Sequence, residues 1–556
     1  MKILGFLFVF IPAFIFGQQT INKENLSKPE FTYWDFNKQR IQSVGSYYKD
    51  QLGVNNDKHG TWKYYDKFGK LEEERTFFRG KLNGKVILYF PNGKMRQEGY
   101  FKMDKQDSIY REWNENGSLA LEGQYEMDTP KGIWKNYYID GRIKSEEKEI
   151  EGLKHIISFW LPDSLHTQLV KKGSGEMQTY YTTGSIKESY TYENGLPNGP
   201  FVESSIYGYD LLTGSFKNGE KDGEWKYYYY TGDLEKISHY KNDQLEGKYE
   251  YYYDSGKLNV VGQYKEDKKD SLWVWYTNKE TIDMKGSFVK DLQDGEWTYR
   301  FPTGEKSYVA YYDKGLKTGD WTYWYKDGSV FKKCQYKNDL KDGRWQTWYE
   351  NGTLLMDGKY VEGKEEGEWL NYWENGNLKN SAFFKNGELH GDWVSNFPDG
   401  TPKMIGEYKT NFKSGTWTEY FSKGKIKDVV SYKVKEKENK MDYGYMKEHK
   451  VLQSVKHGKS VSYSSKDFKK TEEGNYKNGE KHGKWTAYYP GGTYPAIITN
   501  YKNGILEGKM LQYTRRGELT TEINYSKGKK HGDVIIYGSN KKVISKKKFY
   551  YGVEMK

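Results

Sequence analysis

The sequence has little cysteine, little proline and little surplus charge. Its 556 residues include one cysteine and 12 prolines, and 88 Lys and Arg stand against 77 Asp and Glu. The single cysteine, Cys334, excludes an internal disulfide framework and a Cys-rich metal site. The net charge of +11 is too small for this length to indicate binding of nucleic acid.

Aliphatic residues are also scarce, whereas aromatic residues and glycine are abundant. Only 35% of the residues are apolar, yet 17% of the chain is Phe, Trp or Tyr, and there are 60 glycines. This composition is unfavourable for helices or for one large aliphatic core, and it is typical of aromatic strands joined by glycine turns. We therefore expect an ordered, all-β, elongated protein.

Long hydrophobic runs are absent except at the start of the chain. Lys2 is followed by a run from Ile3 to Phe16 without a polar side chain. A positive charge followed by a short apolar run is typical of a secretory signal peptide, here residues 1–17 with cleavage near Gly17. A buried N-terminal strand is the alternative. The signal predicts a secreted or periplasmic protein of the cell envelope.

A glycine recurs every 24 residues through most of the chain, and we call these residues the anchor positions. From residue 175 to residue 415 the step is always 24 residues, with Ser271 in place of one glycine. A fixed period of this length indicates a repeat architecture. The anchor positions are Gly60, Gly84, Ser108, Gly132, Gly175, Gly199, Gly223, Gly247, Ser271, Gly295, Gly319, Gly343, Gly367, Gly391, Gly415, Gly458, Gly483, Gly508 and Gly532.

Other residues keep a fixed distance from the anchors. A tryptophan is usual two residues after the anchor, a second glycine nine after it and Tyr or Phe seventeen after it, as at Trp321, Gly328 and Tyr336. The second glycine indicates a tight turn, because glycine accepts positive φ. We predict one β-hairpin per repeat, with neighbouring hairpins stacked to cover their rings. About nineteen such repeats predict an elongated antiparallel array, a twisted single-sheet ribbon.

Two segments lose the period and divide the array. The steps from Gly132 to Gly175 and from Gly415 to Gly458 are 43 residues instead of 48. Each is expected to hold one degenerate repeat, and a functional insertion is the alternative. The predicted organisation is a signal peptide at 1–17, a cap with a partial repeat at 18–59, regular repeats at 60–141, 175–424 and 458–556, and degenerate repeats at 142–174 and 425–457.

The sequence around each anchor also resembles a known family. Residues 217–228 read Lys-Asn-Gly-Glu-Lys-Asp-Gly-Glu-Trp-Lys-Tyr-Tyr, and similar units run from about Gly45 to Tyr550. They resemble MORN (membrane occupation and recognition nexus) repeats, most closely the bacterial repeat variant of antitoxin-like proteins. The resemblance implies a scaffold for protein contacts, with lipid binding also proposed. The antitoxin label would imply that the protein neutralises a toxin by binding it.

The histidines are the first candidates for metal or catalytic chemistry. Five of the nine immediately precede an anchor, where other repeats have Asp or Asn. These residue types tolerate left-handed backbone conformations, so we interpret the histidines as turn residues. Consecutive repeats lie roughly 10 Å apart, too far for two imidazoles to share one ion. The five are His59, His390, His457, His482 and His531.

Motifs of enzyme active sites are missing from the sequence. It has no Gly-x-x-x-x-Gly-Lys-Ser/Thr loop, no Gly-x-Ser-x-Gly elbow and no His-Glu-x-x-His pair. Carboxylates such as Glu365 and Glu366 lie beside turns, which is typical of a solvated rim. Cys334 is expected to be buried or half-buried and not to act as a nucleophile. We therefore expect no catalytic, cofactor-binding or metal-binding residues, no cofactor, and a protein that is not an enzyme.

The alternation of side chains along the first strand indicates one candidate binding surface. Residues two and four after the tryptophan share its face, and the fourth is aromatic, as at Tyr325 and Tyr349, which assigns this face to the core. The third residue faces the other way among polar neighbours. We predict that these residues bind a partner, with cross-strand packing that stiffens the sheet as the alternative. They are Tyr228, Trp324, Trp348, Tyr372 and Tyr420.

Together these observations predict a secreted or periplasmic, non-enzymatic repeat scaffold that mediates protein–protein interaction. An antitoxin or immunity protein that neutralises a toxin by binding is one alternative. A lipid- or glycan-binding envelope protein is the other. A protein partner is expected, contact with a membrane surface or glycan is open, and neither nucleic acid nor a small-molecule cofactor is expected.

Overall fold

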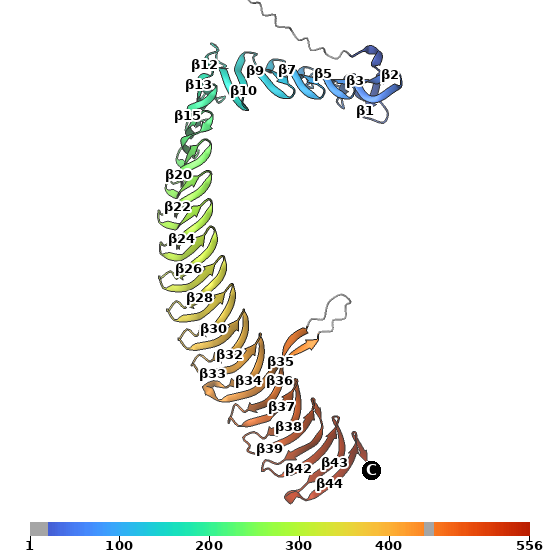
Figure 1. Ribbon diagram of the computed structural model, residues 1–556, viewed down its shortest axis with the longest axis vertical. Coiled ribbons are helices and arrows are strands. Elements are labelled where there is room, and N and C mark those ends of the chain that lie inside the picture. Colours follow the sequence, from blue (N-terminus) through green and yellow to red (C-terminus); the bar gives the residue numbers. More distant parts are fainter. Residues whose placement is uncertain (1–20, 439–449) are drawn as a thin grey trace, which may run out of the picture. The chain divides into compact units, whose positions relative to one another are not determined.

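The computed structural model describes residues 21–438 and 450–556 (Figure 1). The signal peptide expected at residues 1–17 lies outside these residues. The described residues form one antiparallel sheet of 45 strands, with three short 3-10 helices and no α-helix. The predicted all-β array of hairpins in a single open sheet is confirmed. The chain divides into two compact units near residue 260, and each is described by itself.

The first unit begins with a short 3-10 helix and contains twenty strands before the division. Its elements are η1 (Lys23–Asn25), β1 (Glu30–Tyr33), β2 (Ile41–Asp50), β3 (Gly53–Tyr65), β4 (Leu71–Phe78), β5 (Lys81–Tyr89), β6 (Met95–Lys102), β7 (Lys105–Trp113), β8 (Leu119–Glu126), β9 (Thr129–Tyr137), β10 (Ile143–Ile150), β11 (Leu153–Trp160), β12 (Gln168–Lys171), β13 (Ser174–Tyr180), β14 (Ile186–Glu193), β15 (Leu196–Ser204), β16 (Asp210–Lys217), β17 (Glu220–Lys221), β18 (Gly223–Tyr228), β19 (Leu234–Lys241) and β20 (Gln244–Tyr252).

Strand β21 (Leu258–Lys265) lies at the division. The second unit continues with β22 (Lys268–Tyr276), β23 (Ile282–Val289), β24 (Leu292–Arg300), β25 (Lys306–Asp313), β26 (Leu316–Trp324), β27 (Val330–Lys337), β28 (Leu340–Trp348), β29 (Leu354–Val361), β30 (Lys364–Tyr372), β31 (Leu378–Lys385), β32 (Glu388–Asn396), β33 (Pro402–Lys409), β34 (Phe412–Tyr420), η2 (Ser422–Gly424), β35 (Ile426–Glu438), β36 (Lys450–Tyr463), β37 (Lys470–Lys477), β38 (Glu480–Tyr488), β39 (Pro495–Lys502), β40 (Ile505–Leu506), β41 (Gly508–Tyr513), β42 (Leu519–Ser526), β43 (Lys529–Tyr537), η3 (Ser539–Lys541), β44 (Val543–Tyr550) and β45 (Val553–Met555).

Each regular repeat is one hairpin with two kinds of turn. In the repeat anchored at Gly319, the N–H of Gly328 donates to the carbonyl of Tyr325 (3.1 Å) in the turn between β26 and β27. The next turn, between β27 and β28, has Asn338 and Asp339 at φ 49° and 66°. Positive φ at both central residues matches the right-handed twist of paired strands. The turn residues of the period therefore have the roles that their chemistry predicts.

The anchor residues share a positive φ, including the two serines Ser108 (69°) and Ser271 (60°). Gly343 has a φ of 105°, and a Cβ built on it would lie 1.9 Å from Oε1 of Gln335. The pairing of β27 with β28 shifts register at this point, between Cys334 and Tyr336. A bulge of this kind places the anchor residue in a left-handed conformation, which glycine adopts without steric cost. The positive φ therefore explains why glycine recurs at the anchors.

Most tryptophans of the period lie against a small residue of the preceding strand. A Cβ added to Gly286 would lie 2.1 Å from Cδ2 of Trp297. The indole Nε1 of Trp297 donates to the carbonyl of the next residue, Ser287 (3.2 Å). We did not predict this position from the sequence, although it recurs eleven residues before most of the tryptophans. A glycine lies under the indole also at Gly45, Gly123, Gly214, Gly262, Gly358, Gly406 and Gly474.

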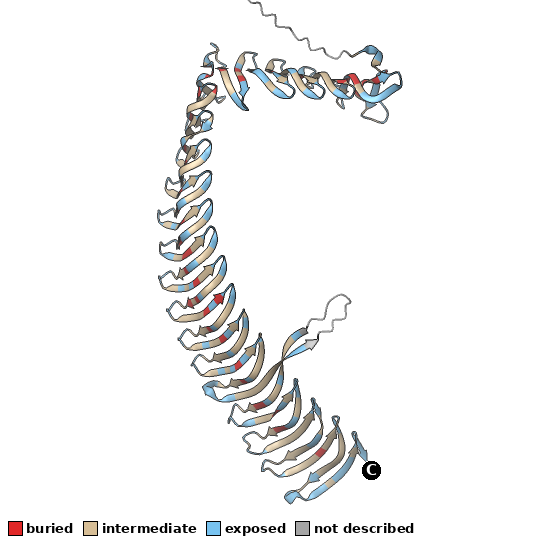
Figure 2. Cartoon of the chain, in the orientation of Figure 1, coloured by how far each residue is buried: buried red, intermediate tan, exposed pale blue. Residues whose placement is uncertain are grey.

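Rings of neighbouring hairpins pack into a continuous row. Tyr336 contacts both Trp321 of its own repeat and Trp345 of the next, with ring centroids 5.1 and 5.9 Å apart. The ammonium group of Lys341 lies 4.6 Å from the centroid of Trp345 and covers it from solvent. Figure 2 shows the buried residues near the middle of the strands and exposed residues at the turns. Successive hairpins therefore shelter one another's rings, as expected.

The two out-of-phase segments differ from each other in structure. Within 142–174, β11 pairs with the short β12 in one irregular hairpin. Within 425–457, β35 and β36 stay paired as far as Glu438 and Lys450, as one long hairpin that stands out from its unit (Figure 1). This long hairpin occurs in place of the degenerate repeat expected there. Its physical reason is that Tyr432 is followed by Lys-Val-Lys and not by an Asn-Gly turn.

Candidate interaction surface

The sheet has two chemically different faces. The Trp face carries the residues two and four after each anchor, as at Trp321 and Tyr323, with their cross-strand partners. The opposite face carries the residues one, three and five after each anchor, as at Asp320, Thr322 and Trp324. The partners of Asp320 and Thr322 on this face are Gln335 and Lys333. The Trp face holds the buried rings, so the opposite face is the candidate interaction surface.

The aromatic residues predicted to bind a partner lie on this opposite face, and all are half-buried. Each ends the first strand of its hairpin and pairs with an aliphatic residue, as Trp348 does with Leu354. They form a row of partly covered rings, which we call the aromatic row. The rings of consecutive repeats are two strands apart, roughly 10 Å. The residues are Tyr228, Trp324, Trp348, Tyr372 and Tyr420.

The backbone of this row also links successive repeats. The hydroxyl of Tyr325 donates to the carbonyl of Trp348 (2.8 Å), and the hydroxyl of Tyr349 donates to the carbonyl of Tyr372 (3.1 Å). Tyr325 and Tyr349 are half-buried and begin the turns, whereas the alternation assigned them to the core face. This hydrogen bond explains the tyrosines at this position, whereas the phenylalanine at the same position of other repeats, as at Phe301, cannot form it.

The histidines next to the anchors do not have the left-handed conformation that was expected for them. None of the five has a positive φ. Instead, Nδ1 of His59 accepts a hydrogen bond from the N–H of Arg79 (3.2 Å), in the turn after the next strand. Asp294 accepts in the same way from the N–H of Lys314 (3.2 Å). The position therefore needs a hydrogen-bond acceptor, which His, Asp and Asn all provide.

Two further observations concern metal and membrane binding. Within residues 21–438 and 450–556, no three His, Cys, Asp or Glu side chains lie close enough together to hold a metal ion. In the same residues, no helix has the length and apolar character needed to cross a bilayer.

Cys334 occupies the small-residue position under the tryptophans. It pairs with Trp321 on one side and Trp345 on the other and is 2% exposed. Burial raises the pKa of its thiol to about 11. The thiol is therefore protonated near neutral pH and packs as a small apolar group, in agreement with the expectation that it is not a nucleophile.

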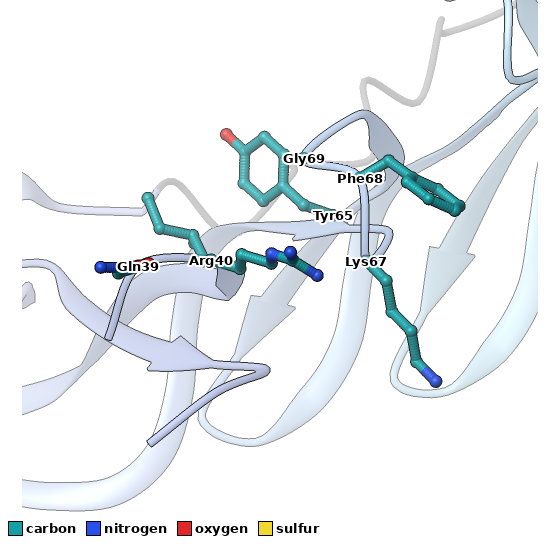
Figure 3. Close-up of a pocket in the computed structure, with 7 residues that line it drawn as sticks. Gln39, Arg40, Tyr65, Lys67, Phe68 and Gly69 are labelled. Atoms are coloured by element: carbon teal, nitrogen blue, oxygen red, sulfur yellow. The ribbon is translucent and has the colours of Figure 1, made fainter. Parts of the chain in front are cut away.

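A hollow beside the first regular repeat brings no reactive groups together (Figure 3). It is lined by residues of the turn after β3, including Lys67 and Phe68, and by Arg40. Figure 3 shows the Lys67 and Phe68 side chains pointing away from each other, and Phe68 is 89% exposed. A ligand site normally has several polar groups aimed at one point. We assign no ligand to this hollow.

Cross-strand ion pairs lie on the opposite face in several repeats. In the first unit, Glu98 is 6% exposed and pairs with Lys85 and with Arg111 (3.6 Å). In the second unit, Arg344 pairs with Asp357 (2.6 Å). Further pairs of this kind in the second unit are Lys509 with Glu522 and Lys546 with Asp533. In these repeats, acidic and basic side chains of the opposite face are paired with each other.

Comparison with known proteins gives one family and no curated relative. The MORN repeat variant matches eight segments: residues 58–78, 82–103, 174–194, 221–242, 245–266, 317–338, 341–362 and 365–386. No curated protein sequence matches the chain.

Among solved structures, similar chains occur in the crystal structure of TcdB2-TccC3-Cdc42 and in the structure of the Photorhabdus luminescens Tc holotoxin pore. Both are 10% identical at a TM-score of 0.13 and cover 90% and 92% of this chain. The chain spans about 30% of the length of each. A similarity at this level does not define the fold, which follows from the strand pairing. The family matches show that the chain contains MORN variant repeats in both of its units.

Proposed function

We propose that this protein is a non-enzymatic repeat scaffold that binds a protein partner through the opposite face of its sheet. The observation on which the proposal depends is the difference between the two faces. The Trp face repeats the same packing in hairpin after hairpin, whereas the opposite face differs in charge and keeps partly exposed rings at Trp324, Trp348 and Tyr372. Large amphipathic rings on a polar ground are typical of protein-binding surfaces. The eight segments that match the MORN repeat variant also support a scaffold function.

Affinity capture with the mature protein tests the proposal. Wild type, Trp324→Ala and Trp348→Ala are each used to capture proteins from an envelope extract. Tyr230→Ala is the matched control, because Tyr230 is an aromatic turn residue that is 84% exposed. The proposal expects one reproducible partner that both tryptophan variants lose and the control keeps. Circular dichroism of each variant checks that the sheet is intact. Equal capture by wild type and all three variants would show that Trp324 and Trp348 do not contribute to the binding site.

The partner's identity separates the narrower functions. A toxin captured in this way would support an antitoxin or immunity role. The proposed location, secreted or periplasmic, is supported by the apolar run from Ile3 to Phe16 after Lys2. It is tested by the N-terminal residue of the protein isolated from envelope and cytosolic fractions. A mature chain that starts near Gln18 in the envelope supports it, and an intact Met1 in the cytosol contradicts it.

A second candidate function, binding of an anionic lipid or glycan, is favoured by a group of lysines on the Trp face. Lys317, Lys332 and Lys341 lie over the rings around Cys334, and Lys332 is 3.7 Å from the centroid of Tyr323. No carboxylate of the described residues lies within 4 Å of these three ammonium groups. Burial, with a contribution from the other two lysines, lowers the pKa of Lys332. Sedimentation with anionic vesicles, for wild type and Lys332→Met, tests this function.

A further inference from the structure

Strands β30 to β34 depart from the ion-paired pattern of the opposite face. Glu368 and Asp392 occupy the position after the anchor in consecutive repeats, and both are exposed. Their cross-strand partners are Phe383 and Glu407, neither of which is basic. Within the described residues, no hydrogen bond or ion pair reaches the carboxylate of Glu368 or Asp392. Two negative charges of this region are therefore left without partners.

Apolar side chains lie directly beside these two acids. Leu370 pairs with Ser381, Ser381 with Val394, and Val394 with Ile405, so that one row of neighbours runs across four strands of the same face. Phe383 and Ile405 are 43% and 37% exposed. Isolated exposed apolar residues are ordinary, but a row flanked by unpaired charge marks a contact surface. The row continues the face that carries Tyr372.

A hollow joins the acidic and the apolar residues. It is lined by Glu368, Ser381, Phe383, His390 and Asp392. The anchor Gly391 helps to form it, since a Cβ on Gly391 would lie 3.7 Å from Cβ of Phe383. The acids of two successive hairpins thus border one exposed ring. They are two strands apart, roughly 10 Å.

We propose that this acidic–apolar patch, made of Glu368, Leu370, Phe383, Asp392, Val394 and Ile405, binds an extended segment of the partner protein with basic side chains on both sides of an apolar one. The inference rests on the proposed scaffold function and names the partner's chemistry. An extended segment presents alternate residues on one side, so a basic–apolar–basic pattern at every second residue matches the patch. The apolar side chain packs on Phe383, and flexible lysine or arginine side chains reach the two carboxylates.

Binding of short peptides to the full-length chain tests the patch. The probe is the labelled peptide Lys-Ser-Leu-Ser-Lys, measured by fluorescence anisotropy. Two matched peptides replace either both lysines by glutamate or the leucine by serine. The proposal expects the first peptide to bind more tightly than both others. It also expects binding to weaken as salt rises to about 0.5 M, because exposed charges are screened.

Amide variants locate the binding. Glu368→Gln with Asp392→Asn is expected to weaken the lysine peptide about tenfold, as the sum of two exposed ion pairs. Glu296→Gln with Asp320→Asn is the matched control at the same position of other repeats, where the carboxylates already accept from Tyr311 and Gln335. The control is expected to bind as wild type does. Ile405→Ser removes an apolar side chain of the patch without changing its charge, and it is expected to weaken binding of the lysine peptide as well.

Peptide binding tests the patch, whereas envelope capture tests the scaffold function, so failure of one can be told from failure of the other. Equal peptide affinity in Glu368→Gln/Asp392→Asn and in wild type, or equal binding of the glutamate peptide, would overturn the patch. The scaffold function would still stand if envelope capture depended on Trp324 and Trp348. Envelope capture could also be unchanged in the two tryptophan variants while peptide binding still depended on Glu368 and Asp392. That result would exclude Trp324 and Trp348 from the binding site and would support the patch.

Discussion

The two faces of the sheet follow the 24-residue period to different degrees. On the Trp face, Trp297, Trp321, Trp345 and Trp369 are all buried and are joined by rings at equivalent positions. On the opposite face, the residue after the anchor is Asp320 in one repeat, Arg344 in the next and Glu368 in the one after. In this stretch the Trp face repeats the same residue types, whereas the opposite face changes in charge from hairpin to hairpin.

In the proposed scaffold, this difference separates the residues that stabilise the sheet from those that bind the partner. A hairpin alone cannot bury an aromatic face, so each repeat needs the same complementary surface as its neighbours. This need restricts which residues can occupy the Trp face. The opposite face makes cross-strand contacts that differ between repeats, as in the pair of Arg344 with Asp357, so its residues can vary from hairpin to hairpin.

Trp297→Ala should cause the largest loss of stability. Trp297 is 1% exposed and contacts Phe288 of the preceding hairpin at 5.0 Å between ring centroids. Truncating a buried tryptophan costs about 3–5 kcal/mol. The loss should be local, so hydrogen exchange in β24 and β25 should accelerate before distant strands respond. Trp324→Ala on the opposite face is the control and should cost clearly less. Equal losses for the two variants would refute the division between the faces.

Gly286→Ala should have the next largest effect. The added methyl group would lie 2.1 Å from the Trp297 indole, so the ring must move. Overpacking of this kind costs about 1–3 kcal/mol. Ala310 occupies the same position under Trp321 and is fully buried, so Ala310→Gly is the reciprocal variant. Urea unfolding followed by hydrogen exchange of the local strands measures both. A neutral Gly286→Ala would show that the indole does not require this glycine.

The sequence was sufficient to predict the hairpin array but not its tightest contacts. The period of Gly319, Trp321 and Tyr336 predicts strands, turns and stacked rings because each depends on local chemistry. The position of Gly286 and Cys334 was missed, although a Gly, Ala or Cys eleven residues before most tryptophans of the period was a usable signal. Register across the bulge at each anchor could not be obtained, because it depends on how two strands pair and not on either alone.

The candidate surface was predicted only in part. Alternation correctly placed Trp324 and Trp348 on the face away from the buried tryptophans, but it could not show how far Leu354 and similar neighbours cover them. The acidic–apolar patch was not predicted, because its signal is the absence of a cross-strand cation. Finding Glu368 without a partner requires knowing that Phe383, and not a lysine, lies opposite.

Glu98→Gln should reduce the stability of the sheet more than Glu368→Gln does, although both residues lie on the opposite face. Glu98 is 6% exposed between Lys85 and Arg111, so loss of its charge should cost about 1–2 kcal/mol. Glu368 is exposed and has no such partner, so its substitution should change stability by less than about 0.5 kcal/mol. Thermal unfolding of both variants under the same conditions makes the comparison. A larger loss at Glu368 would indicate that this acid stabilises the sheet and is not kept for a partner.

The smallest expected effect is a pH dependence at the first regular repeat. His59 is 1% exposed, and burial together with the charge of Arg79 lowers its pKa. The unfolded chain has the ordinary histidine pKa of about 6.5, so it binds the proton at a higher pH than the folded chain does. The contribution of His59 to stability is therefore complete above about pH 6.5 and is lost as pH falls toward the lower folded pKa.

The variant His59→Asn tests this pH dependence, because asparagine keeps a hydrogen-bond acceptor but does not titrate. Asn83 shows that asparagine fits here, since it accepts from the N–H of Met103 at the same position of the next repeat (3.2 Å). Hydrogen exchange of the Arg79 amide from neutral to mildly acid pH should accelerate in wild type beyond the intrinsic pH effect and stay level in His59→Asn. The same pH profile in both proteins would mean that a group other than His59 titrates there.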